Sequence, residues 1–319
     1  MSIDPQTALA TVVAVGEALP TVVKKSFFGA MSRLITGAVE VPAAWLEGIA
    51  QGFRDDTAGR TLVAKEAAQA AAARFGTDPA LADRAVSHFG TRLLREQANR
   101  EFVAAAAAQD LKSDPPVEDA KEQISEDLLD MFARYAESRS DEEVKLYFGK
   151  LLAEEIRRPG SFSPATMHAL STITPKTAAI FQKLCSITIG FPQAPLLSPA
   201  VICDAFGSPG GNGLEPFGLS YVSLAFLQSA GLIHSDLNAW RTAPGVLYLT
   251  PGEISKKLVP LLIPGANPTP EMVEGWQKPL RTNIINLTQA GLELRRIVHA
   301  EPNQTYLDGL RQWLAKAMG

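Results

Sequence analysis

The sequence predicts a mainly α fold, with a multi-helix body followed by a small C-terminal α+β module of winged-helix type. Apolar residues recur at helical spacing along most of the chain, as in helices that pack on one face. Capping residues, several of them followed by proline, precede many of these runs. Short alternating segments typical of strands enter beyond about residue 207. Because the chain has 319 residues, we expect more than one core.

The composition is that of a soluble globular protein. Hydrophobic residues make up 46% and charged residues 20% of the chain, which argues against wholesale disorder and a polytopic membrane protein. The net charge of -4 argues against a large phosphate-binding surface, so nucleic acid is a less favoured partner. Cys185 and Cys203 lie among apolar residues in expected helices, which fits reduced, buried thiols. No secretory signal is recognised, so we expect a cytoplasmic protein.

The N-terminal region, residues 1–56, is expected to contain an amphipathic helix from Val22 to Val39. The apolar face that we single out comprises Val23, Phe27, Met31, Leu34 and Ile35. Such a face either packs on its own domain or another subunit, or lies on a membrane surface, here the inner membrane. Charged residues interrupt the surrounding apolar stretch, which therefore lacks the roughly 18 uncharged residues that spanning requires.

Residues 57–111 form a second region, which is expected to be long and helical. Asp78 followed by Pro79 is a helix start, and this helix is expected to continue to about Leu111. The run from Ala104 to Ala108 offers only small side chains, which allow two helices to approach closely. We therefore expect a helical hairpin or a dimer seam at this run.

A central helical domain is expected over residues 117–195. Two apolar stripes at helical spacing predict two helices, and the second is expected to open with a capping box of Ser140 and Glu143. Further short helices are expected wherever a capping hydroxyl precedes proline, at Ser163-Pro164, Thr174-Pro175 and Ser198-Pro199.

Residues 196–319 are expected to form the winged-helix-like domain. A helix should begin at about Ser220, and the segments 245–250 and 283–288 alternate as strands do. A final amphipathic helix is expected over residues 303–317.

A DNA-binding role would place the helix that starts at Ser220 in the major groove. This helix, SYVSLAFLQSA, contains no lysine or arginine, whereas DNA affinity depends on neutralising phosphates. Cationic residues elsewhere in the domain would form a nucleic-acid or partner patch if the fold brings them together: Lys256, Lys257, Arg281, Arg295 and Arg296. Protein docking is therefore favoured over DNA binding.

No catalytic, metal or cofactor site is expected from the sequence. The four histidines lie far apart and lack the spacing of metal ligands. Glu154 and Glu155 beside Arg157 and Arg158 are interpreted as a solvated, ion-paired face rather than as acid/base groups. The SPGGNG loop lacks the lysine and hydroxyl ending of a P-loop, and no Gly-x-Ser-x-Gly elbow occurs. We therefore expect a protein that is not an enzyme and uses no cofactor.

Three segments carry a family resemblance: REQANRE at Arg95–Glu101, LYFGKLLAEEIRRPGSFS at Leu146–Ser163, and NLTQAGLEL at Asn286–Leu294. Together they resemble bacterial domain-of-unknown-function family 2806, which is related in pattern to the Abi-alpha (abortive infection) proteins. The chain departs from the family pattern at Tyr147 and Phe148, where tryptophan is usual. The resemblance implies a role near antiphage defence and provides no catalytic residues to carry over.

We therefore expect a non-enzymatic, oligomerising protein of bacterial antiphage defence that acts as a sensor, scaffold or adaptor through protein contacts. Its expected partners are further copies of itself and another protein of a defence system. Two alternatives stay open from the sequence. One is an abortive-infection effector that acts on the inner membrane through the Val22 to Val39 helix, and the other is a winged-helix DNA-binding regulator.

Overall fold

The computed structural model describes residues 8–36, 79–116, 124–190, 199–208, 211, 213–234, 236–237, 240–243, 248–249, 259–260 and 280–318. The chain is mainly α, as predicted, and divides into two compact units, unit 1 (Met1–Ser161) and unit 2 (Phe162–Gly319). This boundary falls inside the expected central domain, residues 117–195, because its first two helices pack in unit 1 and its next two belong to unit 2. Residues 57–78 of the expected long helical region lie outside the described part of the chain.

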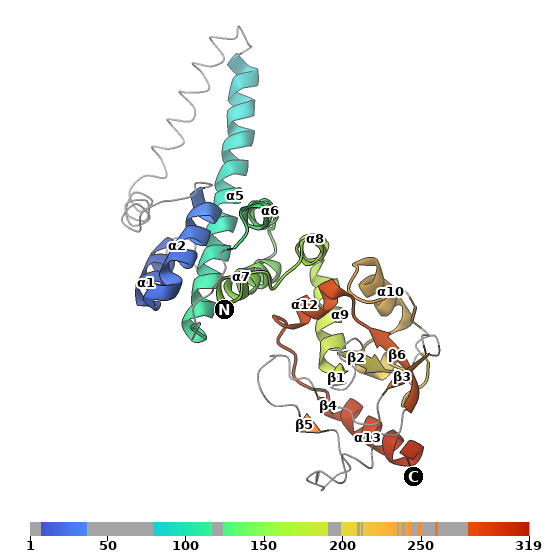
Figure 1. Ribbon diagram of the computed structural model, residues 1–319. Helices are drawn as coiled ribbons and strands as arrows, with labels where there is room; N and C mark the ends of the chain where they lie inside the picture. The colour runs from blue at the N-terminus through green and yellow to red at the C-terminus, as the bar shows by residue number, and fades with distance from the viewer. Residues whose placement is uncertain are drawn as a thin grey trace. The chain divides into compact units, whose positions relative to one another are not determined.

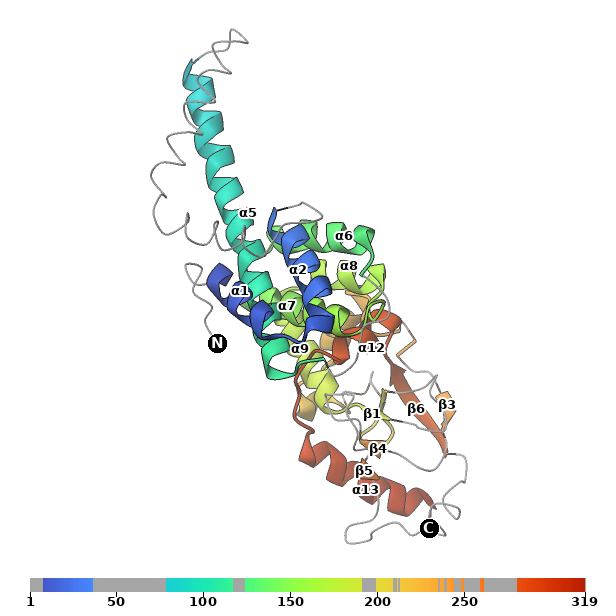
Figure 2. The same cartoon turned by 60° about the vertical axis from the view of Figure 1, so that its left-hand side comes forward.

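Unit 1 contains the described helices α1 (Ala8–Ala18), α2 (Thr21–Thr36), α5 (Pro79–Ser113), α6 (Glu126–Glu137) and α7 (Glu142–Arg157). The long helix α5 contacts each of the other four (Figure 1). Among the α5 residues whose burial is described, the buried ones lie in its C-terminal half. Its N-terminal half extends beyond the other described helices of the unit in both views (Figures 1 and 2). The long helix predicted to start at Pro79 is confirmed.

The small-residue run of α5 packs against α7. Ala104 to Ala108 are all buried. Opposite them, a Cβ added to Gly149 of α7 would collide with the Cβ of Ala106 and lie 3.1 Å from the Ala106 carbonyl carbon. The two helices therefore approach closely because both present small residues at the contact. The predicted close approach is confirmed, and it occurs within one unit.

Helix α7 begins one residue later than predicted. Its N-cap is Asp141, whose carboxylate accepts a hydrogen bond from the backbone amide of Val144 at 3.0 Å. The predicted capping box of Ser140 and Glu143 is therefore wrong. Serine and aspartate are similarly favoured as N-caps, so the sequence does not distinguish Ser140 from Asp141. In the structure the Asp141 carboxylate is the group that caps the helix.

Unit 2 combines helices with a sheet. Its described helices are α8 (Pro164–Thr172), α9 (Pro175–Ser186), the 3₁₀ helix η3 (Glu215–Phe217), α10 (Tyr221–Ser229), α12 (Gln289–Arg295) and α13 (Gln304–Met318). Its described strands are β1 (Ile189–Gly190), β2 (Ala200–Ile202), β3 (Trp240–Ala243), β4 (Tyr248–Leu249), β5 (Val259–Pro260) and β6 (Leu280–Asn286). The order is β3-β6-β2-β1-β4-β5, and the described pairs are antiparallel. In Figure 2, β6 lies beside β3.

Local capping signals predict most helix starts in unit 2 correctly. Ser163, Thr174 and Ser220 cap α8, α9 and α10, and each side chain accepts from the backbone amide three residues further on. The helix predicted to begin at Ser198-Pro199 is wrong, because the chain forms β2 there and Val201 pairs with Ile285 of β6. The predicted strand 245–250 contains β4, and its other residues lie outside the described part of the chain. The predicted strand 283–288 overlaps the end of β6.

The core of unit 2 joins α13 to the sheet through Tyr306. Its hydroxyl donates to the Ile202 carbonyl at 2.9 Å and accepts from the Ile202 amide at 3.0 Å. The ring stacks on Phe206 and meets Phe217 edge to face. The final helix predicted over residues 303–317 is therefore confirmed as α13, which is docked on β2 by a fully buried tyrosine.

Candidate functional site

The apolar face predicted on α2 lies inside unit 1. Its members are all buried: Val23, Phe27, Met31, Leu34 and Ile35. Helix α2 contacts α1, α5, α6 and α7, which cover this face. Of the interpretations left open, packing on its own domain is the one that the structure shows for these five side chains.

An ion pair fixes the polar side of α2. Arg33 donates two hydrogen bonds to the carboxylate of Asp130 on α6, at 2.7 and 2.9 Å. This bonding holds the pKa of Asp130 below its ordinary value. Arg33, which the sequence places off the apolar face, therefore ties α2 to its own unit.

The predicted cationic patch is not assembled by the described residues. Arg295 is only 3% exposed, and its Nε donates to the Thr188 hydroxyl at 2.5 Å. Burial lowers the pKa of this guanidinium. Arg296 lies over the ring of Phe162, with its Cζ 5.4 Å from the centroid. The prediction that Arg295 belongs to an exposed patch is therefore wrong, because its side chain is buried in unit 2 and bonded to Thr188.

The other members of that patch are not placed by the described structure. Lys256 and Lys257 lie outside the described residues. The backbone of Arg281 belongs to β6, and its side chain is not described.

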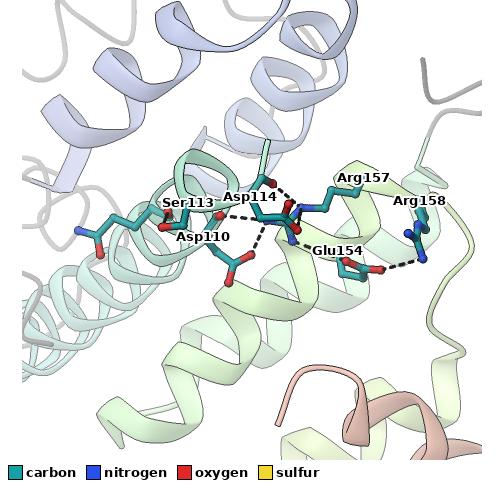
Figure 3. Close-up of polar contacts among 7 residues, drawn as sticks. Asp110, Ser113, Asp114, Glu154, Arg157 and Arg158 are labelled. Carbon is teal, nitrogen blue, oxygen red and sulfur yellow. Dashed lines mark hydrogen bonds and ion pairs between the residues drawn. The ribbon is translucent and has the colours of Figure 1, made fainter. Parts of the chain in front are cut away.

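The charged residues at the end of α7 cap α5 (Figure 3). Arg157 donates to the Asp110 carboxylate at 2.7 Å, to the Asp110 carbonyl at 2.9 Å and to the Asp114 carbonyl at 2.9 Å. Figure 3 shows its guanidinium among these acceptors. Its Nη1 also lies 3.6 Å from the Oε2 of Glu154. A guanidinium at a helix C-terminus satisfies carbonyls that have no partner within the helix. The cluster is structural, and Arg157 is mostly buried rather than solvated.

The neighbouring Glu155 also differs from the expected solvated face. It is 1% exposed, and its Oε2 accepts from the backbone amide of Gly160 at 2.9 Å. Gly160 has φ 80°, a conformation that favours glycine, and the carboxylate closes the turn that follows α7. The buried carboxylate therefore holds a turn, which the alternation of charges in the sequence does not reveal.

The REQANRE segment forms a buried polar cluster with α6 and α7. Asn99 donates to the Glu137 carbonyl at 2.9 Å and accepts from the Lys145 ammonium at 3.3 Å. The same ammonium lies 4.4 Å from the ring centroid of Phe102, and Arg100 forms an ion pair with Glu137. Burial lowers the pKa of Lys145. Asn99 thus links α5 to α6 and α7.

Within unit 2, the last residue of the central family segment meets the third family segment. Glu293, in NLTQAGLEL, accepts from the Ser163 amide at 2.7 Å, from the Ser163 hydroxyl at 3.0 Å and from the Thr166 hydroxyl at 2.5 Å. Ser163 is the last residue of the central segment and the N-cap of α8. A carboxylate at a helix N-terminus is favourable because the first amides and the helix dipole are positive there. Glu293 therefore anchors α12 to the start of α8.

The two thiols are not poised for nucleophilic chemistry. Burial raises the pKa of Cys185 to about 12, and burial raises the pKa of Cys203 to about 12. Cys185 lies in α9 as predicted, whereas Cys203 follows β2 rather than lying in a helix. Within the described ranges, no group of three or more His, Cys, Asp or Glu side chains is arranged to hold a metal ion.

Helix α10 exposes large apolar side chains. Tyr221 is 52%, Val222 60% and Phe226 42% exposed, while Leu224 and Leu227 face the core. The helix is therefore apolar on its outer as well as its inner side, and such surfaces mark interaction sites. The sequence analysis identified the lack of cations in α10 but did not predict its exposed apolar face. Apolar residues occur around most of the circumference of this helix, and this pattern could have indicated the exposed face.

The sequence matches a family described as a protein of unknown function, DUF2806, over residues 83–311. The chain belongs to the DUF2806 family. The three segments REQANRE, LYFGKLLAEEIRRPGSFS and NLTQAGLEL all lie within the matched range. No curated protein and no solved structure matched the chain.

The residues matched by the DUF2806 family include some of the candidate surfaces and not others. Helix α10 and the Glu293 anchor fall inside residues 83–311, whereas α1 and α2 precede them. No helix in the described part of this DUF2806 protein is both long and apolar enough to cross a membrane. The exposed face of α10 is a candidate site for an interaction.

Proposed function

We propose that this chain is a non-enzymatic, self-associating adaptor of bacterial antiphage defence that docks a protein partner through α10. The observation that carries the docking role is the exposed apolar face of α10, formed by Tyr221, Val222 and Phe226. The defence role rests on the resemblance to the abortive-infection proteins. The buried thiols and the structural roles of Arg157, of its carboxylate partners and of Glu293 support a role without catalysis.

The order of elements supports a winged-helix type for unit 2. Among the described elements, helix α9 is followed by β1, β2, η3, α10, β3, β4, β5 and β6, and β6 lies between β2 and β3 in the sheet. In this order α10 takes the place of the recognition helix of a helix-turn-helix module. Its outer side chains are aromatic and aliphatic rather than cationic, which favours a protein surface over DNA.

The two alternatives have less support. A membrane-acting effector would require the apolar face of α2, which unit 1 buries. A DNA-binding regulator would require a cationic surface, and Arg295 lies in the interior of unit 2.

The test is phage challenge of a bacterial host that carries this chain with its neighbouring genes. We expect the wild-type chain to lower the plating efficiency of at least one phage in a broad panel, and Phe226→Ser to remove that protection. Leu93→Ser is the matched control, because Leu93 is also an exposed apolar residue, 63% exposed against 42% for Phe226, but lies on α5. Absence of protection from the wild-type chain contradicts the defence role, and full protection by Phe226→Ser contradicts docking through α10.

Self-association is tested separately by the mass of the full chain in solution. An assembly larger than the 34.2 kDa chain supports this part of the proposal. A mass that stays at one chain up to micromolar concentrations contradicts it.

A further inference from the structure

We propose that α9 and α10 together form a docking surface for an acidic amphipathic helix of a protein partner. This inference rests on the proposed docking function and names the chemistry of the partner. The surface consists of the exposed apolar residues of α10, namely Tyr221, Val222 and Phe226, and of two exposed lysines of α9, namely Lys176 and Lys183.

The two lysines lie near the two ends of α10. The Lys176 ammonium is 4.9 Å from the ring centroid of Phe226 in the second half of the helix. Lys183 lies against Gly218, where an added Cβ would be 3.0 Å from the Lys183 Cδ and Nζ. Gly218 precedes the N-cap of α10, Ser220, by two residues. The apolar side chains are therefore bracketed by positive charge.

The charged side chains of α9 and α10 are all positive. Helix α9 has the sequence PKTAAIFQKLCS and α10 the sequence YVSLAFLQS, which together contain two lysines and no aspartate or glutamate. This contrasts with a chain whose net charge is -4. A partner with an apolar centre and carboxylates at its rim would match both the apolar and the cationic parts of the surface.

The dimensions of the apolar part suit a helix. Val222 and Phe226 are four positions apart on α10, so they lie on one face of the helix and span about 6 Å along its axis. A partner helix with apolar anchors three and four residues apart covers such a short ridge, and this is a recurring mode of peptide recognition. Nucleic acid fits less well, because α10 itself offers no cation and phosphate binding depends on several.

The test is a selection of displayed random peptides of about 15 residues, a length at which helices form on a partner, with the full-length chain as bait. We expect enrichment of sequences that combine apolar residues at helical spacing with an excess of aspartate and glutamate. The enriched peptide is then synthesised, and its dissociation constant is measured by fluorescence anisotropy.

Matched variants define the site. Phe226→Ser and Val222→Ser should each weaken binding about tenfold, because central apolar anchors dominate interface energetics. Reversal of both lysines, Lys176→Glu with Lys183→Glu, should weaken binding several-fold and reduce its salt dependence. Leu93→Ser should leave the dissociation constant unchanged. An unaltered thermal midpoint verifies that each variant is folded.

Each outcome separates the partner chemistry from the docking function. Peptides without an acidic excess whose binding is still lost in Phe226→Ser overturn the acidic partner and leave docking intact. Peptides that bind Phe226→Ser and Val222→Ser as tightly as the wild-type chain, or no enrichment, overturn both. Retention of duplex DNA that is lost on lysine reversal overturns the acidic helix and identifies nucleic acid as the occupant.

Discussion

At the residue scale, Gly149 sets the distance between α5 and α7. The position faces Ala106, and the alanine run of α5 leaves room only for a hydrogen atom there. Sequence reasoning predicted close approach from the alanines but could not identify Gly149 as their partner, because a glycine within a helix carries no signal of what lies opposite. Its role emerges only when two segments far apart in the chain are brought together.

We expect Gly149→Ala to destabilise the protein by about 1–3 kcal/mol, because the added methyl group overpacks the contact between α5 and α7. The matched control is Gly29→Ala on α2, where an added Cβ meets nothing within 4 Å. This control should stabilise the protein by about 0.5–1 kcal/mol through its higher helix propensity. Urea unfolding measures both, and a gain in stability from both substitutions would contradict the packing described.

Lys145 makes stability depend on pH. Burial lowers the pKa of its ammonium from the ordinary 10.5 in the folded state, so the unfolded chain binds more protons between the two values. The penalty for holding the charged form inside is therefore present at neutral pH and is relieved as the pH rises toward 10.5.

We expect the free energy of unfolding of the wild-type protein to rise relative to that of Lys145→Met as the pH increases above neutrality. The difference between the two proteins isolates Lys145, because other titrating groups are common to both. Urea titrations at several pH values measure it. A difference that stays constant or falls as the pH rises would show that the ammonium is not buried.

At the scale of elements, the sequence predicts what depends on local contacts. Ser163, Thr174 and Ser220 cap their helices as predicted, because each cap bonds an amide only three residues away. Ser140 and Asp141 are adjacent capping residues, so sequence alone could not choose between them. The strand β2 was not predicted, because its pairing with β6 joins segments that are distant in the chain.

The α2 face shows the same limit for a candidate site. Helical spacing identified its apolar residues correctly, but the pattern does not say what covers them. The covering residues belong chiefly to α5, α6 and α7, which lie far from α2 in the sequence. The sequence left packing on its own domain, on another subunit or on a membrane surface open for this face, and the structure buries it in the core of unit 1.

We expect Phe27→Asp to destabilise the protein by about 3 kcal/mol or more, because a carboxylate would replace a fully buried ring inside unit 1. Lys25→Asp is the matched control on the exposed side of the same helix, and it should change stability by less than about 1 kcal/mol. Denaturant unfolding compares them. Equal, small effects of the two substitutions would mean that the face is free.

At the scale of the whole molecule, the buried polar groups maintain the helix packing within each unit. Asn99 and Arg157 join helices of unit 1, and Glu293 and Tyr306 join elements of unit 2. Asn99, Arg157 and Glu293 each lie in one of the three family segments. Packing of the helices therefore accounts for these residues of the family pattern. These buried groups are not accessible to a partner, whereas α10 exposes apolar side chains beside two lysines.

The candidate docking surface was only partly predictable. The absence of cations from α10 could be read from the sequence and led to the expectation of protein docking. Its exposure depends on which side of α10 packs on α9, and burial of Leu224 and Leu227 determines this. The burial of Arg295 likewise depends on Thr188, which lies in a separate segment.

The central claim is that the exposed face of α10 contacts a protein partner in the cell. The most direct measurement replaces Val222 with the photoreactive p-benzoylphenylalanine in the full chain, irradiates living cells and identifies the adducts. We predict one protein adduct that is absent when the same group replaces Leu93 and that is weakened by Lys176→Glu with Lys183→Glu. No adduct at position 222, the same adducts at position 93, or an adduct with nucleic acid would contradict the claim.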